Sequence, residues 1–202
     1  MDQSETIIIV GPMASGKTTL AKELEEKHGY QRIVTYTTRP MREGEQNGVD
    51  YNFIDNETFN TMLKSNIFVE DREYKVASGE VWHYASAWAD YISEGKKVVV
   101  LDPFGAIMVV NRFDGNNKNI MADKKPFLVW LDIPQEITMR RALDRGDSVE
   151  EVYRRHKEDF GLFSTTLLKH GRYVDIRISS EYPVDKLAEI VLWEKESGHR
   201  SK

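Results

Sequence analysis

The sequence contains no cysteine, which excludes disulfide bonds, iron–sulfur clusters, thiolate zinc sites and cysteine nucleophiles. It has no apolar run near the roughly 20 residues that span a bilayer, and no basic start followed by a long apolar stretch, as a secretory signal has. Net positive charge is also lacking, because 28 basic and 33 acidic residues give −5. A general nucleic-acid binder is therefore not expected. Together these absences predict a cytoplasmic protein without nucleic-acid or membrane partners.

The residues that are present indicate a folded α/β protein. The 202 residues are 40% hydrophobic and 30% charged, which is typical of one globular domain, or of one core with small insertions. Short β-branched runs alternate with helical patterns, as in parallel sheets. The expected strands are 6–10, 32–35, 97–101, 127–131 and 173–178, and the expected helices are 18–27, 87–94, 135–143, 148–170 and 184–195.

The region 51–84 interrupts this alternation. It combines a short strand, a helix and two further β-like runs, which predicts a small α+β insertion in the parallel core. The polar stretch before it, 36–50, contains Pro40, Gly44 and Gly48 and is not expected to be regular throughout.

The segment from Gly11 to Thr18 satisfies the phosphate-binding pattern G-x-x-x-x-G-K-[ST]. It follows an expected buried strand and begins an expected helix, which is the context that the pattern requires. Its backbone N–H groups attract phosphate oxygens, Lys17 can bridge the β- and γ-phosphates, and Thr18 offers a hydroxyl to Mg²⁺. The sequence thus predicts an ATP site. Its residues are Gly11, Pro12, Met13, Ala14, Ser15, Gly16, Lys17, Thr18 and Thr19.

A second polar constellation runs from Thr35 to Phe53. Arg39 and Arg42, three residues apart and accompanied by tyrosine, offer forked guanidinium donors and a hydroxyl that can hold a phosphate. Charged loops are also commonly just solvated. Taken alone, this stretch leaves both interpretations open.

Together the two constellations resemble the guanylate kinase family. Its members carry TTR, a second arginine and then G-E-x-x-G-x-D-Y-x-F, and this chain has the same order from Thr37 to Phe53. The resemblance covers about residues 5 to 192. It implies an α/β P-loop kinase fold with a parallel β-sheet core, a small α+β monophosphate-binding insertion and a short lid. The core would be 1–35 and 87–202, the monophosphate-binding subdomain 36–86, and the lid about 141–155.

The resemblance also implies roles for single residues. The phosphate of the acceptor GMP would be held by Arg39, Arg42, Tyr51 and Tyr84. Its guanine would face Thr35, Glu70 and Ser86. Asp102 would lie near the acceptor and, through a water, near the Mg²⁺ that Thr18 binds. The catalytic residues would be Lys17, Arg39, Asp102, Arg141, Arg145 and Arg155.

Hydrogen-bond polarity gives an independent reason to expect guanine. A carboxylate such as Glu70 can accept from both N1–H and the exocyclic amine of guanine, whereas adenine offers no such donor pair on that edge. An unmatched buried carboxylate costs several kcal/mol, which is enough to reject adenine strongly.

The expected function is ATP-dependent phosphorylation of GMP, and of dGMP, with Mg²⁺ as cofactor. After Asp102 the family usually has a second acid two residues on, but Pro103 and Phe104 follow here. This departure motivates an alternative, a kinase of the same fold for another acceptor, such as a broader set of deoxynucleotides or a ribose bisphosphate. The other alternative is a non-catalytic module that binds phosphopeptides. Such modules have eroded triphosphate loops, and this loop is intact.

Overall fold

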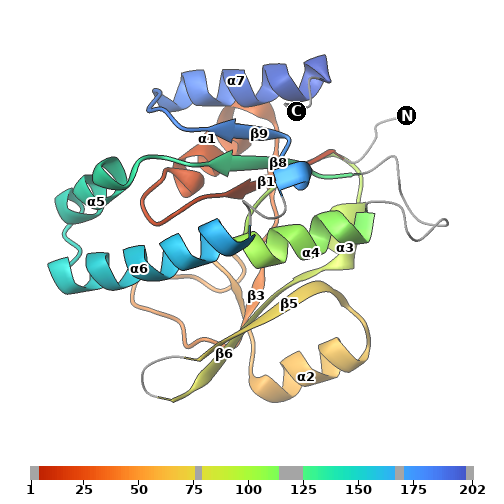
Figure 1. The fold of residues 1–202 in the computed structure, drawn as a ribbon. Coiled ribbons are helices and arrows are strands. Elements are labelled where there is room, and N and C mark those ends of the chain that lie inside the picture. The colour runs from red at the N-terminus through yellow and green to blue at the C-terminus, as the bar shows by residue number, and fades with distance from the viewer. Residues whose placement is uncertain (1–4, 76–78, 114–124, 167–170, 199–202) are drawn as a thin grey trace.

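Two β-sheets organise the chain (Figure 1). The structure, a computed structural model, describes residues 5–75, 79–113, 125–166 and 171–198. One sheet has five strands in the order β2-β7-β1-β8-β9, and the other has four in the order β4-β3-β6-β5. The strands are β1 Glu5–Val10, β2 Gln31–Arg32, β3 Tyr36–Thr37, β4 Asn52–Phe53, β5 Phe68–Lys75, β6 Val81–Ala87, β7 Lys96–Val100, β8 Phe127–Leu131 and β9 Ile176–Ile178. The helices are α1 Lys17–His28, α2 Asn56–Lys64, α3 Trp88–Ile92, α4 Pro103–Phe113, α5 Gln135–Asp144, α6 Val149–Thr166 and α7 Val184–Ser197.

The strand β1 lies at the centre of the five-stranded sheet. It pairs in parallel with β7 on one side and with β8 on the other. Ile7 and Ile9 belong to the hydrophobic cluster on one face, and Ile8 and Val10 to the cluster on the opposite face. A parallel strand covered on both faces needs apolar residues at every position, which is why this segment is a continuous apolar run.

Helices cover both faces of this sheet. Leu20 and Leu24 of α1, with Val191 of α7, pack on one face. Ile107 of α4 and Phe163 of α6 pack on the other. Figure 1 shows α1 and α7 above the sheet and α4 and α6 below it. Among the described residues, none of these helices combines the length and apolar character that would let it cross a bilayer.

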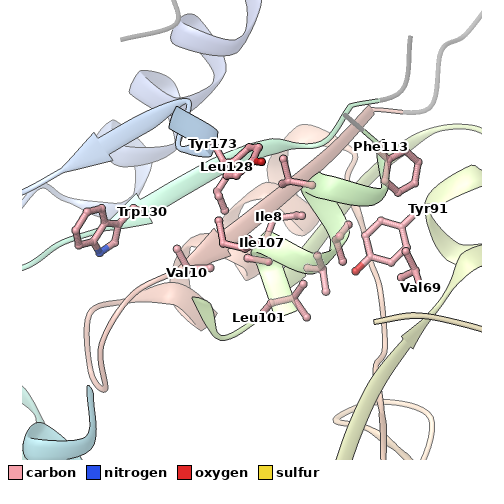
Figure 2. Close-up of a cluster of buried hydrophobic side chains, with 14 of the residues drawn as sticks. Ile8, Val10, Val69, Tyr91, Leu101, Ile107, Phe113, Leu128, Trp130 and Tyr173 are labelled. Atoms are coloured by element: carbon pink, nitrogen blue, oxygen red, sulfur yellow. The ribbon is translucent and has the colours of Figure 1, made fainter. Parts of the chain in front are cut away.

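The four-stranded sheet is joined to this core by apolar side chains. Val69 of β5 and Tyr91 of α3 are buried in the same cluster as Ile107 and Phe113. Figure 2 shows Tyr91 between Val69 and Phe113, and the two rings lie 6.0 Å apart. The second sheet also has a small core of its own, formed by Phe59 and neighbouring side chains. Its strands are therefore fixed relative to the larger sheet.

Three sequence predictions differ from the structure. The expected strand at 32–35 is limited to Gln31–Arg32, because the chain then leaves the edge of the large sheet for the small one. The expected strand at 173–178 is only Ile176–Ile178, since a 3₁₀ turn at Gly171–Tyr173 precedes it. Helix α4 was not predicted, because apolar Phe104 and Met108 lie on its more exposed side and leave only a small polar face near its end. The glycine- and asparagine-rich loop at 114–118 and the expected helix end at His170 lie outside the described residues.

Candidate functional site

A large cleft lies at the carboxyl ends of the central strands. After β1 the chain forms β2 and β7 on one side of it, and later β8 and β9 on the other side. The direction in which strands are added therefore reverses at β1. Parallel sheets bind ligands at such a reversal. Residues that follow β1 and β7 line one cleft of about 1810 Å³. A pocket for one small ligand measures roughly 300 to 1,000 Å³, so this cleft has room for two nucleotides.

The loop after β1 is shaped to surround an anion. Gly16 has a φ of +99°, which favours glycine, and a Cβ at Gly11 would lie 2.5 Å from Ser15 Oγ. The buried Ser15 Oγ has no hydrogen-bond partner among the residues that the structure describes. Lys17 Nζ donates to the backbone oxygens of Gly11 and Pro12, at 2.7 Å each. A bound phosphate would offer a charged acceptor to the Ser15 hydroxyl and the Lys17 ammonium.

Lys17 is a partly buried cation, and the loss of surrounding water alters its acidity. Desolvation lowers the pKa of the Lys17 ammonium from 10.5 to about 8. Asp159 opposes this shift, and the charges of Arg145 and Arg155 add to it. Lys17 therefore titrates near pH 8.

Asp159 is a cleft residue that the sequence did not reveal. Its Oδ2 accepts from the backbone N–H of Met13 at 2.6 Å, across 146 positions of the chain. Burial raises the pKa of the Asp159 carboxyl, which the Met13 N–H and Lys17 oppose. The Asp159 carboxylate thus accepts a hydrogen bond from a backbone N–H of the kind that binds phosphate oxygens. No local pattern marks it, because α6 reaches the loop only through the tertiary fold.

Three predicted lid arginines line the same cleft. Arg141 donates to Ala14 O at 3.5 Å and to Glu181 Oε1 at 2.9 Å. Arg145 pairs with the carboxylate of Asp147. Arg155 Nε lies 2.5 Å from Glu151 Oε1. Each of these cations has a carboxylate partner in this structure.

On the acceptor side, four of the predicted residues line the cleft in addition to Asp102. They are Thr35, Arg42, Tyr51 and Tyr84. The rings of Tyr51 and Tyr84 lie 5.9 Å apart, edge to face. Two hydroxyls and an exposed guanidinium therefore face the cavity that the phosphate loop also lines.

The structure does not bring Arg39 to the cleft surface. Its side chain is only 4% exposed, and Nη2 pairs with Glu45 Oε1 at 2.7 Å. The guanidinium lies over the ring of Tyr51, 5.5 Å from its centroid. Arg39 therefore lies behind Tyr51 and can support it. Glu45, its partner, was not predicted as a site residue.

Glu70 and Ser86 are also buried and do not line the cleft. Ser86 Oγ donates to Glu70 Oε1 at 2.7 Å, and Tyr91 OH donates to Ser86 Oγ at 3.0 Å. Arg72, which no sequence pattern marks, donates from Nε to Glu70 Oε2 at 2.8 Å and does line the cleft.

Asp102 lines the cleft at the start of α4. Its Oδ1 accepts from the N–H groups of Phe104, at 2.8 Å, and Gly105, at 3.1 Å, and so caps the helix. Its Oδ2 accepts from Tyr74 OH at 2.7 Å and pairs with Arg72. This aspartate is therefore held by both the small sheet and the helix.

The donors of the cleft are compatible with Mg²⁺. Within the described ranges, no three His, Asp or Glu side chains form a metal-binding group. Magnesium bound with phosphates usually needs only one or two protein ligands, because phosphate oxygens and waters supply the rest. The exposed Thr18 hydroxyl in the cleft fits that requirement.

A sequence model described as "Guanylate kinase" matches residues 3–160. The chain belongs to the guanylate kinase family. The fold is accordingly an α/β P-loop kinase fold. A guanylate kinase of known structure from Anaplasma phagocytophilum superposes with a TM-score of 0.63 over 98% of this chain and 87% of that one. At 19% identity, this likeness concerns the fold alone.

Relatives named guanylate kinase share parts of the sequence. One from Chromohalobacter salexigens is 37% identical over 53% of this chain, and the match spans half the length of that protein. One from Chlorobaculum tepidum is 32% identical over 73% of this chain and 71% of its own. One from Sus scrofa is 31% identical over 75% of this chain and 72% of its own.

The acidity of Lys17 generates a prediction for ATP binding. Only the ammonium attracts phosphates, so affinity for ATP should fall as the pH rises through about 8, the pKa of Lys17. The fall should approach tenfold per pH unit, measured as the Kd between pH 7.5 and 9.5. Lys17→Met should bind weakly with little pH dependence, and Lys22→Met, at an exposed site, should keep the wild-type profile. A constant wild-type Kd would contradict the assignment.

Asp159 generates a second prediction. Asp159→Asn keeps an acceptor for the Met13 N–H and removes a negative charge beside the phosphate loop. The Kd for ATP should fall roughly threefold to tenfold, an effect of about 1 kcal/mol for one partly screened charge. Glu158→Gln is the matched control, because Glu158 lines the same cleft but is exposed and pairs with Arg154. Weaker binding by Asp159→Asn would contradict this prediction and mean that the carboxylate supports ATP binding, by keeping Lys17 charged or by holding the metal.

Proposed function

We propose that this protein transfers the γ-phosphoryl group of ATP to GMP, and to dGMP, giving ADP and the diphosphate. The observation that carries the proposal is that two anion-binding ends share one cleft. The phosphate loop forms one end, and Arg42, Tyr51 and Tyr84 form the other. Membership of the guanylate kinase family supports the choice of ATP and GMP. The reaction would take place in the cytoplasm, where a kinase has access to ATP.

The donor half of the reaction relies on positioning and charge. The loop holds the triphosphate, and Lys17 bridges the β- and γ-phosphates as the transition state develops. Bound Mg²⁺ would neutralise phosphate charge, held by Thr18 and, through a water, by Asp102. The lid arginines Arg141, Arg145 and Arg155 would exchange their carboxylate partners for phosphate oxygens. Phosphoryl transfer then needs no covalent intermediate on the protein.

The acceptor half belongs to the proposed monophosphate-binding subdomain, residues 36–86. Arg42, Tyr51 and Tyr84 would hold the GMP phosphate directly. Arg39, buried against the ring of Tyr51, would act as a positioning residue. The guanine would lie at the end of the cleft that Thr35 lines, next to the buried Glu70 and Ser86. Lid closure would exclude water and so favour phosphoryl transfer to the acceptor over hydrolysis of ATP.

The test of this function is an ADP-release assay with ATP, Mg²⁺ and a panel of acceptors. GMP and dGMP should be turned over, and AMP, CMP and UMP should be poor substrates. Product analysis should identify the nucleoside diphosphate. If ADP release is the same without an acceptor, the protein is an ATPase. Turnover of another acceptor alone would replace GMP in the proposal.

Arg42 provides the prediction specific to the acceptor end. Arg42→Ala should raise the KM for GMP by roughly tenfold to a hundredfold, because a hydrogen bond between charged groups contributes about 1.5 to 3 kcal/mol. The KM for ATP should change less than twofold. Arg112→Ala removes an exposed arginine from the far end of α4 and should leave both constants unchanged. A larger effect on ATP than on GMP would mean that the two ends are assigned the wrong way round.

A further inference from the structure

Helix α6, which lies below the large sheet in Figure 1, carries an apolar stripe on its outer side. Val149, Tyr153 and Phe160 follow at intervals of four and seven residues, so they project from one face of the helix. Their exposed fractions are 54%, 63% and 74%. The cleft lining on α6 comes from a different side of the helix, as at Arg155 and Glu158. Exposed apolar side chains gathered on one face are typical of an interaction surface.

The charged residues of α6 behave differently on its two sides. Toward the cleft, Glu151 and Arg154 pair with one another and with further residues of the same helix. Glu150 and Lys157 lie beside the outer stripe and are exposed, and neither has an ion-pair partner among the residues that the structure describes. The seven residues between them place both on the same flank of the stripe, about 10 Å apart along the helix axis. They are therefore too far apart to pair with each other.

A two-fold axis makes this surface complementary to itself. In an antiparallel pair of identical helices, such an axis brings the same flank of both helices together. Glu150 of one copy then faces Lys157 of the other when the axis passes between positions 153 and 154. The midpoint of the stripe lies between positions 154 and 155, only about 1.5 Å along the helix. One placement therefore covers the stripe and pairs both charges, which identifies a second copy of this chain as the matching partner.

We propose that the outer stripe of α6 is an interface between two copies of this chain, packed antiparallel about a two-fold axis. Val149 of each copy would lie near Phe160 of the other, and the two Tyr153 rings would lie next to the axis. Each Glu150 would pair with Lys157 of the other copy. The cleft stays accessible, because its lining on α6 comes from a different side of the helix. This inference does not depend on the proposed function.

The size of the stripe predicts a weak dimer. Stable interfaces cover roughly 800 Å² on each partner, and three side chains with two flanking charges cover less. Sedimentation velocity of the full chain, at roughly 5 to 500 µM, should show the sedimentation coefficient rising from the monomer value toward the dimer value. A single monomeric species over the whole range overturns the proposal.

Charge reversal tests whether this face forms the dimer. Glu150→Lys places lysines opposite each other at both symmetry-related positions, and Lys157→Glu places glutamates there. Each variant alone should have a dissociation constant raised roughly tenfold, because two attractive pairs become repulsive. An equimolar mixture should associate as strongly as the wild type, since the heterodimer contains only opposite-charge pairs. Wild-type association by each variant alone, or no recovery in a mixture of variants that thermal unfolding shows to be folded, refutes the interface.

Tyr153 provides an independent test at the centre of the stripe. Tyr153→Glu places a charge next to the axis in both copies and should abolish association over the same concentration range. Glu25→Lys reverses a charge at an exposed site on α1 and should keep the wild-type association. A dimer that persists in Tyr153→Glu is formed by another face of the molecule and contradicts the assignment. The mixing experiment decides the question even if Tyr153→Glu does not fold.

Discussion

Burial of β1 on both faces is the constraint on which the rest of the structure depends. Because β1 pairs with β7 and β8 at the same time, the strands end along one edge of the sheet. Gly11 and Asp102 both follow strands that end at this edge. The continuous apolar run of β1 thus fixes where its loop can be, and the loop in turn fixes the position of Lys17.

The positive charges of the arginines in the cleft are each balanced by a neighbouring carboxylate. Arg141, Arg145 and Arg155 each contact a carboxylate. These pairs are partly exposed, so each contributes little to stability. Exchanging such a partner for a phosphate oxygen therefore costs little free energy. The hydrogen bond from the Met13 N–H to Asp159 is a similar case, because a protein carboxylate accepts from a donor that a phosphate would use.

The two sheets are coupled through both apolar and polar contacts. Val69 and Tyr91 extend the main core toward the small sheet. Arg72 links Glu70 of β5 to Asp102, which also caps α4. The small sheet is thereby connected to the start of α4, beside the strand end near the phosphate loop.

The sequence alone determined the elements whose causes are local. The apolar run of β1, the glycine pattern after it and the helix that follows were predictable because sterics, hydrophobicity and backbone hydrogen bonds act over a few residues. The exposure of each side chain was decided only by the tertiary structure. Arg39 and Glu70 belong to recognisable patterns, yet packing buries both. Asp159 and Arg72 reach the cleft through contacts between distant elements. Helix α4 was missed because apolar Phe104 and Met108 lie on its more exposed side, which leaves little of the polar face by which a helix is recognised.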